Sequence, residues 1–319
     1  MRPPLSREPT PELLSGDTPA RVLRRYLGST RPMFLTASVL PVLVGSAWGW
    51  QAAEVFDPLV FVVALVVVAL VHAGANVAND VADNQSGTDQ QNEQRIHPFT
   101  GGSRFIQNGI MTPREMTLWA AALLTAGIAL GLLLVMLKGP WVLVFGFAGI
   151  GLGLAYSVPP LALSSRGMGE VAVAAAFGVL PVIGSFWLQA GFVTSEALLV
   201  SIAMGLWAMA VLVINEIPDV AADASAGKRT LVVRLGPRSS AWLYLVVQLA
   251  AFLAFVLAVL AGAIGWASLT LPTGLLVLAA WTARTINRSR DNLRRGIVWT
   301  LVIHALGAFW LAALAFAAR

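Results

Sequence analysis

Asparagine and aspartate side chains recur at helical spacing in a polar segment that follows an apolar run. Asn76, Asp80 and Asp83 stand at positions i, i+4 and i+7, so a helix continued through them would place all three on one face. Asn79 stands beside Asp80, and the four residues are called the first acid cluster. Carboxylates at these spacings repel one another, yet no lysine or arginine lies between them. The pattern favours a cation site over a purely structural helix.

A second polar segment repeats this chemistry much later in the chain. Asn215, Asp219 and Asp223, the second acid cluster, are spaced four residues apart after another apolar run. Hard divalent cations take oxygen ligands, and Mg²⁺ is typically held by one or two carboxylates together with substrate phosphate oxygens. The chain has no cysteine and three histidines, which disfavours softer metals. We expect Mg²⁺; the alternative is a pair of solvated helix ends with capping and turn residues.

Basic residues follow each acid cluster. Arg95 and Arg104 come after the first, and Lys228 and Arg229 come after the second. Carboxylate-bound Mg²⁺ flanked by such cations can hold a diphosphate and neutralise its charge as it leaves. These four are therefore candidate diphosphate-binding residues.

The elements that carry the clusters must lie in a membrane. Of the 319 residues 57% are hydrophobic and only 12% are charged, against about 25% charged in ordinary soluble domains. A bilayer core requires roughly 20 apolar residues per helix, and backbone groups in lipid must pair within the segment. The sequence predicts an all-α polytopic fold with nine transmembrane helices, over residues 33–53, 57–79, 116–137, 140–160, 169–190, 196–217, 240–262, 266–283 and 297–317.

The distribution of basic residues predicts the orientation. With a cytoplasmic N-terminus, 19 of the 21 lysines and arginines fall on the cytoplasmic side, and only Lys138 and Arg319 fall on the other. This predicts an inner-membrane protein with both acid-rich loops in the cytoplasm. Residues 1–30 are expected to form a disordered cytoplasmic tail, because they are rich in proline and lack an apolar core. Basic residues confined to loops, without interleaved aromatics, indicate no nucleic-acid partner.

The two polar loops are similar to one another. Asp83-x-x-x-Gly87 matches Asp223-x-x-x-Gly227, and both follow a span that runs toward the cytoplasm. The match suggests a same-direction duplication within the 31–319 transmembrane domain, with halves of about 31–165 and 166–319. A secondary transporter is the alternative from another class, but its site would lie near the bilayer midplane, where these spans carry almost no charge.

Taken together, these motifs resemble the UbiA superfamily of intramembrane prenyltransferases. The likeness covers nearly the whole chain after the tail. Its motifs, besides the acid clusters, are Arg31-Pro32, Gly101-Gly102-Ser103-Arg104, Tyr156-Ser157-x-Pro159-Pro160, Arg166-Gly167-x-Gly169-Glu170 and Gly227-Lys228-Arg229. The resemblance implies helices around a central cavity open to lipid and Mg²⁺-dependent transfer from a polyprenyl diphosphate to a small aromatic acceptor.

The resemblance also implies roles for single residues. Asp80 and Asp83 would hold one Mg²⁺, with Asn76 and Asn79 beside them. Asp219 and Asp223 would hold the other, with Asn215 beside them. Arg95, Arg104, Lys228 and Arg229 would bind the diphosphate.

Three further residues have both a functional and a structural interpretation. Tyr156 would stabilise the allylic cation through its ring, or serve as an interfacial belt residue. Arg31 would bind an anionic acceptor, or anchor the first span at the cytoplasmic face. Asp89 is a further candidate metal ligand, or a turn residue.

The spacing around the first acid cluster bears on the acceptor. The motif with Gly87 and Asp89 is most similar to the 1,4-dihydroxy-2-naphthoate polyprenyltransferases of menaquinone synthesis. 4-Hydroxybenzoate enzymes usually place a third acid where this chain has Gly87. Transfer to 4-hydroxybenzoate, homogentisate, a haem or a lipid alcohol remains an alternative, and the sequence leaves the prenyl chain length and the oligomeric state open.

Overall fold

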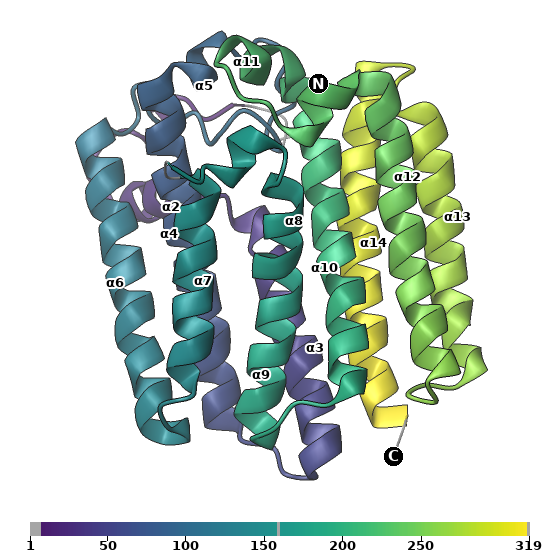
Figure 1. The fold of residues 1–319 in the computed structure, drawn as a ribbon. Helices are drawn as coiled ribbons and strands as arrows, with labels where there is room; N and C mark the ends of the chain where they lie inside the picture. The colour runs from purple at the N-terminus through teal and green to yellow at the C-terminus, as the bar shows by residue number, and fades with distance from the viewer. Residues whose placement is uncertain (1–7, 158–159, 318–319) are drawn as a thin grey trace.

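The computed structural model describes residues 8–157 and 160–317, and all regular structure within these ranges is helical. The elements are α1 (Pro11–Leu14), α2 (Pro19–Ser29), η2 (Pro32–Phe34), α3 (Thr36–Ala53), α4 (Pro58–Ser86), α5 (Thr88–Gln91), α6 (Pro113–Lys138), α7 (Val142–Ser157), η3 (Leu163–Arg166), α8 (Gly169–Ala174), η4 (Ala175–Val179), α9 (Leu180–Ala190), α10 (Ser195–Glu216), η5 (Ile217–Asp219), α11 (Val220–Ser225), α12 (Leu231–Leu260), η6 (Trp266–Leu269), α13 (Thr270–Thr285) and α14 (Arg290–Ala317). The long helices run side by side, with α5 and α11 at one end and the last turn of α14 at the other (Figure 1).

Eight helical segments in the described ranges are long and apolar enough to cross a membrane. They match eight of the nine predicted spans. The remaining one, predicted over 140–160, corresponds to α7, whose 16 residues extend about 24 Å at 1.5 Å per residue. That length is short of the roughly 20 residues that a bilayer core requires, so the predicted count of nine is not confirmed. The end of that predicted span includes residues 158–159, which lie outside the described ranges.

The prediction of a disordered tail over residues 1–30 is wrong for part of this segment. Two helices, α1 and α2, lie within it, each with a proline in its first turn. The Tyr26 ring packs edge-on against Trp119 of α6 at 5.1 Å, and the Trp119 indole donates to the Tyr26 carbonyl oxygen at 3.2 Å. The high proline content of residues 1–30 did not exclude helices, because proline is tolerated in the first turn of a helix.

Helix α4 carries the first acid cluster because the helix continues beyond its apolar part. It spans 29 residues from Pro58, where the Asp57 side chain accepts from the Val60 amide, to Ser86, where Gly87 ends it at φ 76°. The predicted apolar span ends at residue 79, so the last two turns of α4 extend past it and present Asp80 and Asp83 at the rim. The i, i+4, i+7 arrangement is confirmed.

The second acid cluster lies across a change in helix geometry. Helix α10 ends at Glu216, a short 3₁₀ turn follows, and α11 begins at Val220. Pro218 lacks a backbone N–H, which explains why the α-helical ladder is interrupted there. Asp219 therefore lies in the turn, and Asp223 lies in the following helix.

Small residues allow the helices of the bundle to approach closely. A Cβ on Gly178 would lie 2.1 Å from the Gly205 Cα, and a Cβ on Gly307 would lie 2.2 Å from the Trp207 ring. Close contact of this kind is how helices associate in lipid, where burial of apolar surface gives little driving force. Helix α10 packs against α12 and α14, and α3 packs against α9, so the core holds the rim of α4 and α10 in place.

Candidate active site

The two acid clusters meet at one end of the bundle, although 140 residues separate Asp83 from Asp223. The Lys228 Nζ lies 2.8 Å from Asp83 Oδ1 and 3.4 Å from Asp223 Oδ1. Burial by itself would lower the pKa of Lys228, but the carboxylates of Asp83 and Asp223 raise it above its ordinary value. Lys228 is therefore a firmly charged bridge between the two clusters.

Asn92 supplies a second link that the sequence did not suggest. Its Nδ2 donates to Asp219 Oδ1 at 2.8 Å across 127 residues of sequence. Asn92 caps the short helix α5 and is buried. A polar residue in a polar loop carries no distinguishing signal, so only the fold identifies this contact.

Asp80 is the most enclosed carboxylate of the first cluster, with 3% of its surface exposed. Its Oδ2 accepts from the Ser103 amide at 3.0 Å, whereas its Oδ1 is buried and has no hydrogen-bond partner among the described residues. Gly102 has φ 73°, and a Cβ there would lie 3.2 Å from Asp80 Oδ1 and 2.9 Å from Asp89 Oδ2. The Gly101-Gly102-Ser103-Arg104 loop thus lies directly against two of the predicted ligands.

Asp89 is buried beside this loop. Its Oδ2 accepts from the Gln107 side chain at 3.0 Å, a contact that sequence reasoning missed. Burial, reinforced by the charges of Asp83 and Asp80, raises the pKa of Asp89 to about 7. Asp80, Asp83 and Asp89 thus lie close enough to repel one another, and a bound cation would reduce this repulsion.

The predicted arginines occupy different positions. Arg104 is buried, donates to the Asp89 backbone oxygen, and has its pKa lowered by burial and by the charge of Arg95. Arg31, at φ 55°, donates to the Phe99 carbonyl oxygen at 3.0 Å, and its charge acts on Asp80, Asp89 and Asp219. Arg31 therefore lies near carboxylates of both acid clusters.

Two of the predicted diphosphate-binding residues are less well placed. Arg95 forms a salt bridge with Glu8 at 2.8 Å and donates to the Asn92 carbonyl oxygen at 2.7 Å. Arg229 is exposed, and its amide donates to the Ser165 carbonyl oxygen at 3.0 Å. The structure therefore places Arg104 and Lys228 nearest the acids, and Arg95 and Arg229 at the periphery.

The asparagines and Tyr156 surround the same region. Asn79 Nδ2 donates to Asp83 Oδ2 at 2.9 Å, which holds Asp83 toward Lys228. Asn76 donates instead to the Thr30 carbonyl oxygen at 3.0 Å, while Asn215 Oδ1 is buried and accepts no hydrogen bond within residues 8–157 and 160–317. The Tyr156 ring lies beside Gly169, where a Cβ would come within 3.4 Å of it, and the charges of Glu216 and Asp83 act on its hydroxyl.

The oxygen donors have the chemistry of a magnesium site. The oxygens Asp80 Oδ1, Asn92 Oδ1 and Asn215 Oδ1 are buried and accept no hydrogen bond from the described residues, which suits a hard cation that takes oxygen ligands. In the described ranges no three Asp, Glu or His side chains are grouped closely enough to enclose an ion. The donors fit Mg²⁺ in type, and Lys228 supplies the positive charge between the clusters.

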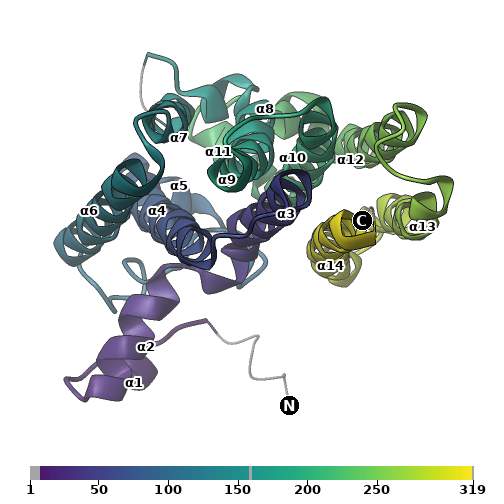
Figure 2. The ribbon, with the colours of Figure 1, turned by 90° about the horizontal axis from the view of Figure 1, so that it is seen from below.

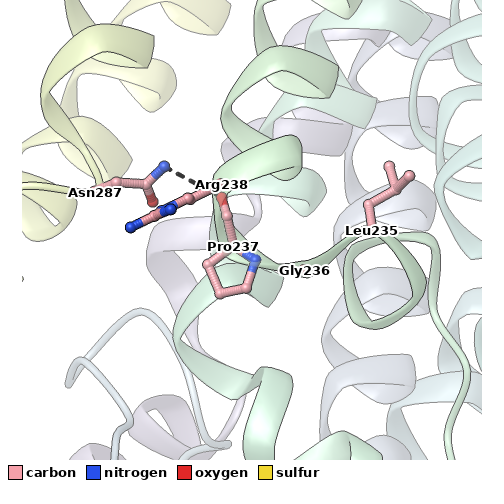
Figure 3. A pocket seen from close by; sticks show the side chains of 5 residues that line it. All are labelled: Leu235, Gly236, Pro237, Arg238 and Asn287. Carbon is pink, nitrogen blue, oxygen red and sulfur yellow. Dashed lines mark hydrogen bonds between the residues drawn. The ribbon is translucent and has the colours of Figure 1, made fainter.

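A separate hollow lies at the kink of α12. Gly236 adopts φ 77° there, and a cavity of about 470 Å³ is lined by Leu235, Gly236, Pro237, Arg238 and Asn287 (Figure 3). The Asn287 side chain donates to the Pro237 carbonyl oxygen at 3.3 Å. None of these residues belongs to an acid cluster, so this hollow is distinct from the candidate active site.

Comparison with known proteins decides the family. A model of the UbiA prenyltransferase family matches residues 38–302, which is most of the chain. The chain belongs to the UbiA prenyltransferase family. The resemblance predicted from the motifs is confirmed, and this UbiA family member is a multi-pass membrane enzyme that transfers prenyl groups.

Similar proteins include two bacterial enzymes and one archaeal structure. The 1,4-dihydroxy-2-naphthoate octaprenyltransferase of Haemophilus influenzae is 32% identical over 269 residues, 81% of this chain and 84% of the relative. The enzyme of the same name from Mycobacterium tuberculosis is 31% identical over 295 residues, 89% and 97% of the two chains. A UbiA homologue from Archaeoglobus fulgidus, solved bound to DMAPP and Mg²⁺, superposes with a TM-score of 0.66 over 92% of this chain and 99% of that one at 18% identity, which establishes the shared fold.

Proposed function

We propose that this UbiA family member transfers a polyprenyl chain from an isoprenyl diphosphate to 1,4-dihydroxy-2-naphthoate, a step of menaquinone synthesis. The observation that carries the proposal is the Lys228 bridge, because it brings carboxylates from both acid clusters to one place. The names of the bacterial relatives support the choice of acceptor.

We assign the metal to the acids of both clusters. Asp80, Asp83 and Asp89 would hold Mg²⁺ on one side, and Asp219 and Asp223 would hold it on the other. When bound, Mg²⁺ neutralises the diphosphate and makes it a better leaving group. With Asp83 and Asp223 holding the metal, Lys228 would be available to phosphate oxygens, since its ammonium group can pair with either a carboxylate or a phosphate.

Basic side chains of the site then hold the diphosphate. Lys228 and Arg104 are the nearest to the acids and bind its oxygens, and Arg95 and Arg229 act at the periphery. The charge of Arg31 acts on Asp80 and Asp219. Its guanidinium group is therefore a ligand either for the diphosphate or for the carboxylate of the acceptor. The C–O bond of the allylic diphosphate breaks with its electron pair leaving on the diphosphate.

The remaining steps concern the cation and the acceptor. Apolar walls exclude water that would quench the allylic cation, and the Tyr156 ring stabilises it through its π face. The electron-rich ring of the acceptor forms the new C–C bond to the cation, and its carboxylate leaves as carbon dioxide, so that the electron pair of the broken C–C bond restores the aromatic ring. The excess of basic residues at this end of the bundle supports an active site on the cytoplasmic face of the inner membrane.

The proposal is tested with the purified chain in proteoliposomes. A labelled polyprenyl diphosphate is offered with 1,4-dihydroxy-2-naphthoate, 4-hydroxybenzoate or homogentisate, with and without Mg²⁺, and products are identified by mass. We expect a prenylated, decarboxylated naphthol that forms only with Mg²⁺. A product with another acceptor and none with the naphthoate overturns the acceptor, and transfer at full rate without a divalent cation overturns the metal assignment.

A further inference from the structure

The helix α2, which precedes the first membrane span, has two chemically different faces. At 100° per residue, Leu23 and Leu27 lie on one side together with the half-buried Val22 and Tyr26. Arginines occupy the opposite side, at positions 21, 24 and 25, and α2 contains no acidic residue. Such a division is typical of helices that lie in a membrane interface.

Only half of the apolar face of α2 is covered by the protein. Tyr26 packs on Trp119, whereas Leu23 and Leu27 are 59% and 52% exposed. Leu13 of the adjoining α1 is exposed as well. Figure 2 shows α1 and α2 at the periphery of the bundle, outside α4 and α6. The exposed leucines therefore require another apolar environment.

The position of α2 in the chain places it next to the bilayer. Two residues separate its last residue, Ser29, from the segment Pro32–Ala53 that enters the membrane. At about 3.5 Å per residue this link spans only about 10 Å, so the C-terminal end of α2 lies close to the point where the chain enters the membrane.

We infer that α2 is an interfacial helix that binds the anionic phospholipid surface, with Leu23 and Leu27 inserted at the acyl boundary and Arg21 and Arg24 on the headgroups. The arginines complement anionic lipid, worth roughly a fivefold change in binding for each charge near the surface. A second copy of the chain is a poorer occupant, because it would cover the leucines but give the arginines on the opposite side of α2 no anionic partner.

The contacts of α2 connect this surface to the candidate active site. A Cβ on Gly28 would lie 2.9 Å from the Phe105 ring, and Asn76 holds the Thr30 carbonyl oxygen. The next residue, Arg31, holds the Phe99 carbonyl oxygen, so the ends of the 99–105 loop are attached to the C-terminal end of α2. Because this loop bears Ser103, whose amide holds Asp80, docking of α2 on lipid orders the diphosphate site; this step rests on the proposed function.

Site-directed spin labelling tests the position of α2 without using activity. The chain has no cysteine, so single variants Leu23→Cys, Leu27→Cys, Arg21→Cys and Arg24→Cys can be labelled directly in the full-length protein. In vesicles of phosphatidylcholine and phosphatidylglycerol, labels at 23 and 27 should be accessible to oxygen and shielded from a water-soluble nickel chelate. Labels at 21 and 24 should show the reverse. Labels at 23 and 27 that favour the chelate, or that are shielded from both reagents, overturn the inference.

Transfer activity tests the coupling between lipid and site. We expect wild-type activity to rise at least about twofold from phosphatidylcholine alone to an equal mixture with phosphatidylglycerol. Arg24→Glu should abolish this rise and keep the activity measured in phosphatidylcholine, whereas Arg288→Glu, at an exposed turn between α13 and α14, should keep the rise. Equal stimulation of both variants overturns the coupling. A wild type without transfer in any lipid overturns the proposed function, while the labelling result still decides where α2 lies.

Discussion

The two acid clusters serve one site but are held in different ways. The first is carried by an unbroken helix, α4, and is covered by a long returning loop whose Ser103 amide and Gly102 backbone lie against its acids. The second straddles a proline turn and is fixed by Lys228, which follows it after four residues. The two segments therefore match in sequence but hold their acids by different structural means. The first half supplies the enclosure, and the second supplies the bridging charge.

The difference also appears in the electrostatics. Asp80, Asp83 and Asp89 crowd one another in the first half, and the pKa of Asp89 reaches about 7. Lys228, which forms salt bridges with acids of both halves, belongs to the second half, and its pKa is raised by the acids on both sides. Asp83 of the first half and Asp223 of the second thus share a cation that the second half supplies, and the following predictions test this asymmetry.

The largest expected effect is the loss of one acid from either cluster. Asp80→Asn and Asp219→Asn should each lower Mg²⁺-dependent transfer by roughly 10²–10³-fold, the range for removing a group that stabilises developing charge. Activity is measured in proteoliposomes, with Asp291→Asn at the exposed start of α14 as the control. If one variant keeps wild-type activity, its cluster is not part of the site.

Replacement of the bridge should have the next largest effect. Lys228→Met leaves Asp83 and Asp223 facing one another without a cation, so we expect kcat/KM to fall about 10- to 100-fold and unfolding free energy to fall by about 1–2 kcal/mol. Because Mg²⁺ can take over the carboxylates, added Mg²⁺ should restore the stability but not the diphosphate affinity. Arg238→Gln, which removes a charge at the α12 kink, should change neither quantity. A stable, fully active Lys228→Met would show that the bridge is dispensable.

The parts of the site that sequence predicted are those encoded locally. The spacing of Asp80 and Asp83 follows from one helix, and their convergence with Asp223 follows from two spans that run in the same direction. Asn92 could not be found in this way, because its contact with Asp219 joins residues 127 apart through a loop without a periodic pattern. Gln107 was missed for the same reason.

The fold was predictable to a similar extent. Length and hydropathy identify the long spans, since the bilayer imposes them. The short α7 and the docked α2 depend on packing against neighbours, as in the contact of Tyr26 with Trp119, and composition carries no record of such a neighbour. Arg31 likewise depends on local backbone geometry, because its left-handed conformation turns the chain between α2 and η2, where its charge acts on Asp80 and Asp219.

A pH dependence should be specific to the first half. Below a pKa of about 7 Asp89 is protonated, and protons then compete with the metal. From about pH 8 to about pH 6 the Mg²⁺ concentration for half-maximal activity should rise about tenfold. Because folding raises this pKa, Asp89 contributes fully to the metal-free stability below about pH 4, and this contribution is lost as the pH rises through about 7. Asp89→Asn should reduce the pH dependence of both the Mg²⁺ requirement and the stability. An unchanged pH profile in that variant would assign the pH dependence to another group.

The smallest effects should come from two glycines that share a backbone conformation but not a neighbourhood. Gly102 and Gly227 have φ 73° and 75°, so alanine at either position should lower the unfolding free energy by about 1–2 kcal/mol through backbone strain. In the part of the chain that the structure describes, a Cβ at Gly227 meets nothing within 4 Å, whereas one at Gly102 lies 2.9 Å from Asp89 Oδ2. Gly102→Ala should therefore also displace the acids and lose roughly a further 1 kcal/mol of transition-state stabilisation, about fivefold in kcat/KM. Thermal unfolding and kinetics of both variants separate the two effects. Equal kinetic losses would mean that strain alone matters and that the loop of the first half does not position its carboxylates.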